Sequence, residues 1–162
     1  MGERWTADDW DIERVAALVH WAHMGQRDKG GKPYFGHVSR VRLLVQREML
    51  RRGAPMEAIL NAEKVALLHD LLEDTPFTAG MLQDLGLPTH ILIPVMLLTR
   101  EPGRPEEGYY AQIREHPVAL LVKEMDIEDN LSPARLSVLD QATQDRLKAK
   151  YAKARTALGL DA

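Results

Sequence analysis

The feature that most constrains this chain is an apolar segment interrupted by ionisable residues, VALLHDLLEDT, from Val65 to Thr75. Its valine, alanine and leucine residues leave almost no polar face around a helix, and a helix that is apolar all round is normally buried. His69 and Asp70 nevertheless stand in its middle. Because burying an unpaired carboxylate is costly, this segment needs a cation, a metal ion or strong hydrogen-bond donors beside it.

Two further acids follow one helical turn later. Glu73 lies four residues after His69, and Asp74 lies four residues after Asp70. Residues at this spacing share a helix face, so a continuous helix would gather one imidazole and three carboxylates at one end. The segment therefore predicts half of a metal site.

Two other segments carry residues that can complete such a site. His37 follows a Gly- and Pro-containing loop, and Asp126 is an acid within the apolar stretch ALLVKEMDIEDNL. Two imidazoles and two carboxylates can hold a divalent ion and leave positions for water and a phosphate oxygen. Taken alone, a His-Asp pair is also compatible with a hydrogen-bonded core pair. We predict one divalent-ion site with four ligands: His37, His69, Asp70 and Asp126.

The order H…HD…D resembles that of the HD superfamily of metal-dependent phosphohydrolases. More of the chain follows the pattern of the alarmone-hydrolase domain of the RelA/SpoT group. The matching segments are AHMGQRDKGGKPYFGH (22–37), ALLHDLLEDT (66–75), LT (98–99) and VKEMDIEDN (122–130). The chain is most similar to small stand-alone HD proteins related to that group, which carry DKGG-x-PY and D-x-EDN.

This resemblance implies an all-α fold, a single HD-domain helical bundle over residues 1–162 with its core at about residues 10–155. It implies a metal-dependent phosphohydrolase with one divalent ion, expected to be Mn²⁺, acting on a nucleotide phosphate or pyrophosphate. The family reaction is removal of the 3′-pyrophosphate from guanosine alarmones such as ppGpp. Another nucleotidase or nucleotide phosphatase is the alternative enzyme, and a non-catalytic, metal-bound nucleotide sensor is the alternative from a different class.

The resemblance also implies roles for individual residues. Glu73 and Asp74 correspond to the acids that position or deprotonate the attacking water. Asn130 corresponds to a residue that helps hold the nucleoside, and Lys29 belongs to the ligand-binding loop. From their placement beside the first metal histidine, Tyr34 is expected to stack on a base and Arg40 to reach a phosphate. The predicted substrate contacts are therefore Lys29, Tyr34, Arg40 and Asn130.

Several positions depart from the long alarmone enzymes, and three of them bear on the ligand grip. Asp28 stands where those enzymes carry an arginine that grips the nucleotide, and its negative charge is expected to repel phosphate. Ser132 and Pro133 replace an Arg-Thr pair that contacts phosphate. These departures indicate that the chain contacts its ligand differently from the long enzymes, and they do not identify the substrate.

Composition agrees with a compact intracellular enzyme. The 162 residues include no cysteine, which excludes disulfides and thiolate metal sites. A net charge of −3 gives no footprint for general nucleic-acid binding. The longest apolar run, 91–98, is far below the ~20 residues of a spanning helix, so the expected location is the cytoplasm without membrane attachment. The oligomeric state stays open.

The apolar periodicity predicts helices and no strands. Thr6 and Asp9 form a capping-box pattern that opens the first helix. Pro55 begins the helix that carries Val65 to Asp74. The expected helices cover about residues 6–23, 37–52, 55–74, 78–85, 88–99, 109–116, 117–131 and 141–158.

Overall fold

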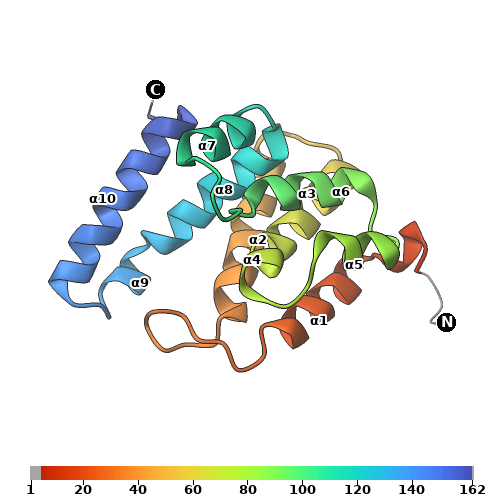
Figure 1. Cartoon of the computed structure of the whole chain (residues 1–162), viewed down its shortest axis with the longest axis horizontal. Coiled ribbons are helices and arrows are strands. Elements are labelled where there is room, and N and C mark those ends of the chain that lie inside the picture. Colours follow the sequence, from red (N-terminus) through yellow and green to blue (C-terminus); the bar gives the residue numbers. More distant parts are fainter. Residues whose placement is uncertain (1–4, 162) are drawn as a thin grey trace.

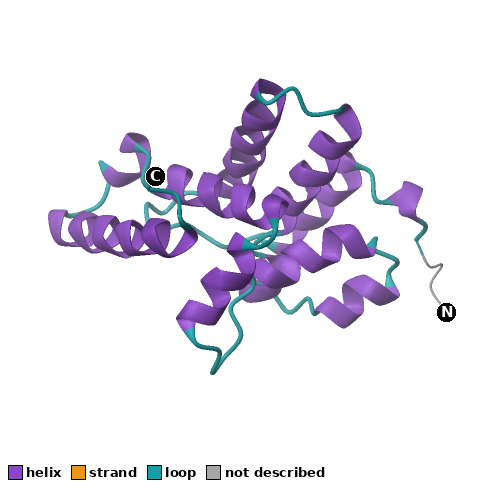
Figure 2. Ribbon diagram, turned by 90° about the horizontal axis from the view of Figure 1, so that it is seen from above, coloured by secondary structure: helices purple, strands orange, loops and turns teal. Residues whose placement is uncertain are grey.

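The chain folds into helices joined by loops (Figure 1). The structure is a computed structural model that describes residues 5–161, and this part of the chain forms no β-strand (Figure 2). In order, its helices are η1 (Ala7–Asp9), α1 (Ile12–Ala22), α2 (Phe35–Arg51), α3 (Met56–Leu68), α4 (Leu71–Asp74), α5 (Ala79–Asp84), α6 (Thr89–Leu98), α7 (Glu106–Arg114), α8 (Pro117–Asn130), α9 (Pro133–Leu136) and α10 (Gln141–Leu158). The predicted all-α class is confirmed.

Helix α3 lies at the centre of the fold. It packs against α1, α2, α6 and α8, so neighbours surround it on several sides. Its buried residues follow no single stripe: Ile59, Ala62, Glu63, Val65, Ala66, Leu67 and Leu68. Burial of an apolar face against neighbours is the main source of helix stability in proteins. The expectation that this segment is buried all round is confirmed.

Helix α10 packs against α7 and α8 at the edge of the bundle, opposite the end that carries α5 and the amino terminus (Figure 1). Its ends are well determined by sequence. The side chain of Asp140 accepts a hydrogen bond from the backbone N–H of Thr143, and Gly159 closes the helix with φ of 71°. A left-handed residue just after a helix is a typical glycine position.

The first predicted helix is broken near its start. The capping box of Thr6 and Asp9 is present, but it opens the short helix η1 instead of α1. Helix α1 begins at Ile12, with the side chain of Asp11 accepting from the backbone N–H of Arg14. Between them the chain turns so that Trp10 is fully buried. The large apolar area of an indole ring explains why burial overrides a continuous helix here.

The predicted helix through Val65 to Asp74 is also interrupted, at the residues of most interest. Helix α3 ends at Leu68, and α4 starts at Leu71. Asp70 has φ of −105° and ψ of 0°, outside the helical region. The prediction of an unbroken helix was therefore wrong, and His69 and Asp70 project from a bend between α3 and α4.

The remaining helices match their predicted ranges to within a few residues, except that α9 was not expected. Pro94 lies inside α6 without ending it. Helix α6 is strongly apolar because it packs against α3, α5, α7 and α8. Among the helices of residues 5–161, none combines the length and apolar character required to cross a membrane.

Candidate metal centre

The four predicted ligands come from three segments of the sequence and lie close together. Three of them, His37, His69 and Asp126, can offer atoms to one ion, and Asp70 adjoins the two imidazoles. His37 lies in the first turn of α2, and Asp126 lies in α8. Nε2 of His37 is 3.2 Å from Oδ1 of Asp126 and 3.7 Å from Oδ2 of Asp70. Nε2 of His69 is 2.9 Å from Oδ2 of Asp70 and 3.7 Å from Oδ1 of Asp126. The structure thus brings two imidazoles and two carboxylates together, with both imidazoles buried.

The proton positions on His69 show that this cluster fits a cation. Its Nδ1 lies 2.6 Å from the carbonyl oxygen of Ala66, which can only accept, so Nδ1 carries a proton. Its Nε2 faces the carboxylates, and although Oδ2 of Asp70 is 2.9 Å away, the angles form no hydrogen bond to it among the described residues. A buried ring nitrogen that faces two carboxylates needs a proton or a metal ion between them. His37, His69 and Asp126 are placed to offer ligand atoms to one ion, and N and O donors suit a first-row divalent metal.

The carboxylates create a strongly negative environment around the imidazoles. Burial lowers the pKa of His37, but hydrogen bonding to Asp126 and Asp129 and the charge of Asp126 together outweigh burial, so the pKa is raised overall. Burial also lowers the pKa of His69, yet the negative charge of Asp70 and contact with Asp126 raise it well above its usual value. The same field that holds protons on the imidazoles attracts a metal cation.

Two neighbours on α8 hold Asp126. Nζ of Lys123 lies 2.9 Å from Oδ2, and Nδ2 of Asn130 donates to Oδ1 at 2.7 Å. Burial raises the pKa of Asp126, but the positive charge of Lys123 and the contacts with His37 and His69 together outweigh burial, so the pKa lies well below its usual range. Asn130, predicted to bind substrate, therefore also fixes a candidate ligand. Sequence reasoning missed Lys123, although its spacing of three residues from Asp126 on a helix was a usable signal.

Tyr34 was predicted to stack on a base, and its hydroxyl holds the second candidate acid ligand, Asp70. The hydroxyl donates to Oδ2 of Asp70 at 2.6 Å. Burial and the charge of Asp70 raise the pKa of Tyr34, so it remains a donor. Its ring lies 5.5 Å from the ring of His37. The geometry gives Tyr34 a supporting contact, while stacking on a ligand stays a prediction.

Glu73 and Asp74 lie in α4 and line the same cleft as the candidate ligands. Oε1 of Glu73 accepts from the backbone N–H of Arg100 at 2.5 Å, which orients that carboxylate. Burial raises the pKa of both carboxyl groups, and the negative charge of Asp70 raises them further. A carboxyl group with a raised pKa beside a metal site is suited to exchange a proton with water.

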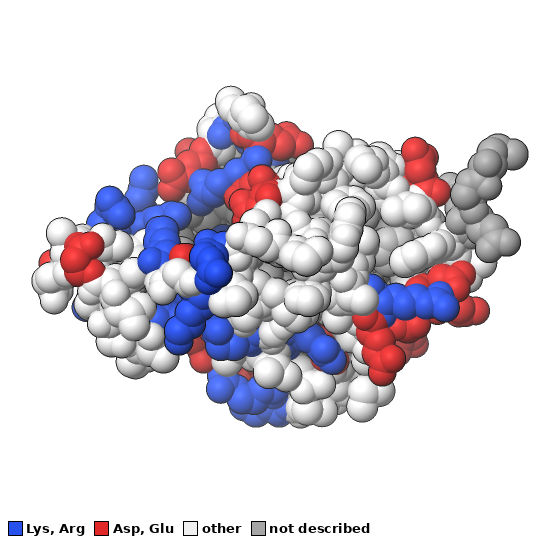
Figure 3. All heavy atoms as spheres, turned by 90° about the horizontal axis from the view of Figure 1, so that it is seen from below, with Lys and Arg blue, Asp and Glu red and all other residues white. Residues whose placement is uncertain are grey.

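A cleft of about 360 Å³ opens over the cluster, within the roughly 300–1,000 Å³ of typical small-molecule sites. Its floor holds the acids described above. Besides Arg135, its lining includes five cationic residues, here called the basic wall: Arg27, Lys29, Arg100, Lys123 and Lys150. On the face seen from below in Figure 3, most of the Lys and Arg side chains lie on the left half of the view.

The cations of the basic wall repel one another, and a bound anion would reduce that repulsion. Burial and the charges of Lys123, Lys29 and Arg100 together lower the pKa of Lys150. The guanidinium of Arg100 is fixed over the ring of Tyr109, 4.5 Å from its centroid. A cleft that combines carboxylates at its floor with cations along its sides can hold a metal ion and a phosphate at once.

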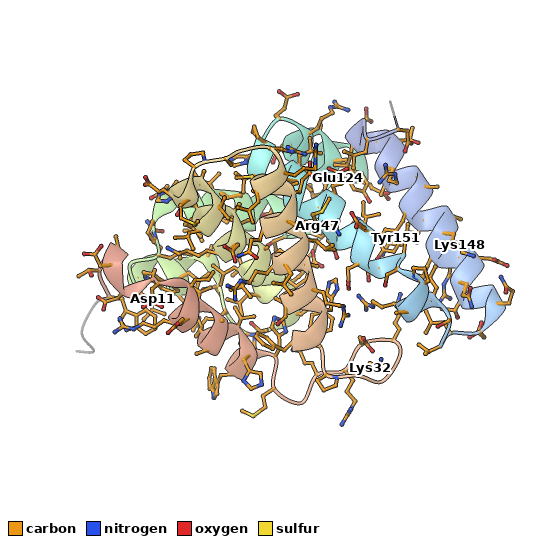
Figure 4. The ribbon with its side chains drawn as sticks, turned by 180° about the vertical axis from the view of Figure 1, so that it is seen from behind. Asp11, Lys32, Arg47, Glu124, Lys148 and Tyr151 are labelled. Atoms are coloured by element: carbon orange, nitrogen blue, oxygen red, sulfur yellow. The ribbon has the colours of Figure 1, made fainter. Side chains whose placement is uncertain are left out.

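A second, more apolar chamber adjoins the cleft. The two spaces share Asp28, Lys29, Asn130 and Arg135 in their linings. The second chamber is also lined by three aliphatic side chains from the carboxyl-terminal segment: Val138, Leu139 and Leu147. Tyr151, on the side of α10 that faces α8 (Figure 4), lines the cleft itself. An apolar chamber beside a charged cleft suits a ligand with one apolar and one anionic end.

Asp28 is placed differently from our expectation. Its carboxylate does not project freely toward a ligand, because the side chain is only 5% exposed. Oδ1 accepts from the backbone N–H groups of Gly30 and Lys32, and Oδ2 lies 3.7 Å from Nη2 of Arg135. Its charge is therefore compensated within the protein, and Asp28 shapes the loop before α2; its effect on a phosphate stays a prediction.

Arg40 is likewise engaged inside the protein. Its Nε donates to Oδ1 of Asp129 at 2.7 Å, although the residue also lines the second chamber. Lys29 is exposed and lines both spaces. Ser132 precedes α9 and lines the second chamber, while Pro133 is the first residue of α9. The sequence analysis did not single out Asp129 and Arg135, which meet behind His37.

Neither a family model nor a curated protein sequence matches this chain. Among solved structures, it is similar to a metazoan ortholog of SpoT that is described as hydrolysing ppGpp and playing a role in starvation responses. The TM-score is 0.68 at 23% sequence identity, and the match covers 90% of this chain and 84% of the other. The likeness establishes that the two proteins share a fold, as the sequence pattern predicted.

Proposed function

We propose that this chain, which shares the fold of a SpoT-like ppGpp hydrolase, is a divalent-metal-dependent phosphohydrolase of nucleotide phosphates or pyrophosphates. The observation that carries the proposal is one cleft that joins the histidine–aspartate cluster to the basic wall. The acids alone would repel phosphate, and the cations alone would bind phosphate without cleaving it. Their combination is what phosphate-ester hydrolysis requires.

The residues divide into holding and reacting groups. The ion would be held by four side chains: His37, His69, Asp70 and Asp126. A divalent ion such as Mn²⁺ supplies Lewis-acid chemistry, which favours ionisation of water and offsets charge on phosphoryl oxygens. Glu73 and Asp74, on the same side of the cleft, take a proton from the attacking water. Arg100 orients Glu73 through its backbone N–H.

The shape of the two spaces supports a nucleotide. The basic wall can meet more than one phosphate, and the adjoining chamber offers aliphatic side chains to a base. Lys29 and Asn130 line both spaces, so they lie where a ribose would connect base and phosphates. Because the structural neighbour is described as a ppGpp hydrolase, the first substrate to test is guanosine 3′-pyrophosphate alarmone.

The test is release of phosphate or pyrophosphate from a nucleotide panel that includes ppGpp, with Mn²⁺ and after removal of metal by EDTA. We expect release that requires Mn²⁺ and returns when Mn²⁺ is restored. Release from other nucleotides but not ppGpp would make the chain a different nucleotidase. If metal and nucleotide both bind but no product forms, the enzyme proposal fails and a metal-bound sensor replaces it.

The position of Asp28 gives a separate prediction. Asp28→Arg should raise KM for nucleotides, because an arginine cannot cap Gly30 and Lys32 and would face Arg135. Loss of loop hydrogen bonds of about 1 kcal/mol each corresponds to several-fold to tens-fold weaker binding. Steady-state kinetics and nucleotide titration measure this, with Lys32→Arg as a control that keeps the charge and the backbone N–H. A lower KM for Asp28→Arg would instead indicate that the carboxylate of Asp28 repels the phosphate of the nucleotide.

A further inference from the structure

One buried carboxylate has no role in the function proposed above. Asp129 belongs to the D-x-EDN segment of α8, and only 4% of the residue is exposed. Its Oδ2 lies 2.7 Å from Nδ1 of His37, the ring nitrogen on the other side from the Nε2 that faces Asp126. Asp129 therefore contacts a candidate metal ligand from behind.

Two arginines hold this carboxylate in place. Arg40, one turn after His37 on α2, donates from Nε to Oδ1 at 2.7 Å and from Nη2 to Oδ2 at 3.3 Å. Arg135, on α9, donates from Nη1 to Oδ2 at 2.8 Å. Figure 4 views the molecule from behind and shows α2 beside α8, with Lys32 in the loop that leads into α2. A buried acid with donors from α2 and α9 is oriented as well as charged.

We propose that Asp129 is a positioning residue that accepts the Nδ1–H of His37 and so keeps Nε2 directed at the metal position. The inference rests on the proposed metal centre. An imidazole that gives the lone pair of Nε2 to an ion carries its proton on Nδ1, and a carboxylate there fixes the tautomer and the ring orientation. Such partners strengthen metal binding without touching the ion.

The surroundings of Nδ1 contain a competing donor. Nη1 of Arg135 lies 2.7 Å from Nδ1, and it would donate to that nitrogen only if Nδ1 carried no proton. Nε2 would then carry the proton and could not bind an ion. Arg135 already has an acceptor in Oδ2 of Asp129, so it does not need the lone pair of His37. The tautomer of His37 therefore decides between the two arrangements.

The first experiment determines that tautomer. The full chain with ¹⁵N-labelled histidine is loaded with diamagnetic Zn²⁺, and the ring nitrogens of His37 are assigned by NMR. We expect a proton on Nδ1 that exchanges slowly with water, with Nε2 showing the shift of a metal-bound nitrogen. A His37 ring with its proton on Nε2 would overturn the proposal.

The second experiment measures Mn²⁺ affinity by equilibrium dialysis. Loss of an outer partner of a metal ligand typically weakens affinity by about 10–100-fold. Asp129→Ala should approach the upper end of that range, whereas Asp129→Asn, which keeps an acceptor oxygen, should approach the lower end. If Asp129→Asn binds Mn²⁺ no more tightly than Asp129→Ala does, the acceptor oxygen does not have the role assigned to it.

Glu63 provides a matched control. It is 1% exposed and accepts from Nε of Arg42 at 2.7 Å, so it is also a buried acid paired with an arginine of α2. No contact joins its side chain to His37 among the described residues. Glu63→Gln should lower the urea midpoint of unfolding while leaving Mn²⁺ affinity unchanged.

The outcomes separate the two proposals. If the wild-type chain binds no divalent ion, the metal centre itself fails. If the wild type binds Mn²⁺ and Asp129→Ala binds equally well, only the positioning role of Asp129 fails. An equal loss of affinity in Glu63→Gln would show a general effect of disturbed packing and would also overturn that role. Should Asp129→Ala not fold, the NMR measurement on the wild type still decides.

Discussion

Glu73→Gln and Asp74→Asn should each reduce turnover by about 10²–10⁴-fold, the span expected for a general acid–base group. Both carboxylates line the cleft beside the cluster, but neither is among the side chains that converge on the ion position. The amide variants keep side-chain size while losing the ability to take a proton. Mn²⁺ affinity and the unfolding midpoint should therefore remain close to those of the wild type.

The measurements are single-turnover product release, Mn²⁺ dialysis and urea unfolding on the same preparations. Asp84→Asn serves as the control, because Asp84 is an exposed acid at the end of α5 outside the residues lining the cleft. Full activity in both amide variants would show that water is activated by another group. Loss of Mn²⁺ together with activity would instead make these acids metal ligands.

Asp126→Asn should abolish Mn²⁺ binding and also destabilise the metal-free protein. The carboxylate of Asp126 is the acid partner of Lys123, whose side chain is 15% exposed. Removing one member of a buried ion pair leaves the other charge uncompensated, at a cost of about 3–5 kcal/mol. Asp70→Asn should abolish Mn²⁺ binding with a smaller loss of stability, because Asp70 is partly exposed and its contact with Tyr34 can persist with an amide oxygen.

Urea unfolding in EDTA measures the free energy of unfolding without any contribution from bound metal. Dialysis against Mn²⁺ then gives the affinity of each folded variant. Lys123→Met is the informative companion, because it removes the charge that Asp126→Asn would strand. The double variant should recover part of the stability lost in Asp126→Asn but none of the metal binding. Equal stability of the two aspartate variants would contradict the ion pair as the source of the difference.

The structure explains why several helices and the burial of α3 could be predicted from the sequence. Helix α10 and the burial of α3 follow from apolar spacing, capping residues and the glycine after Leu158, all of which act over a few residues. The convergence of His37 with Asp126 was expected from a family pattern and from the need to compensate a buried acid. The periodicity, the caps and the cost of a buried acid were visible in the sequence itself, whereas the pairing of His37 with Asp126 came from the family resemblance.

The bend at His69 and Asp70 was not visible in that way. The segment is apolar on nearly every side of a helix, and a continuous buried helix satisfies every local rule. In the folded chain, Asp70 accepts from Tyr34, which lies 36 residues earlier in the sequence, and the segment breaks where this contact forms. The helix break therefore coincides with a contact between distant segments, which local spacing does not encode.

The sequence by itself determined the all-helical class, the buried central helix and the types of side chain available to a metal ion. Those properties depend on periodicity, capping and the cost of burying charge, which are local or compositional. Tertiary structure alone decided which charges neutralise each other. Asp28 meets Arg135, and Asp129 meets both Arg40 and His37, across as many as 107 positions of sequence (135 − 28). Coulomb and hydrogen-bond energies depend on distance in space, and no local spacing encodes that distance.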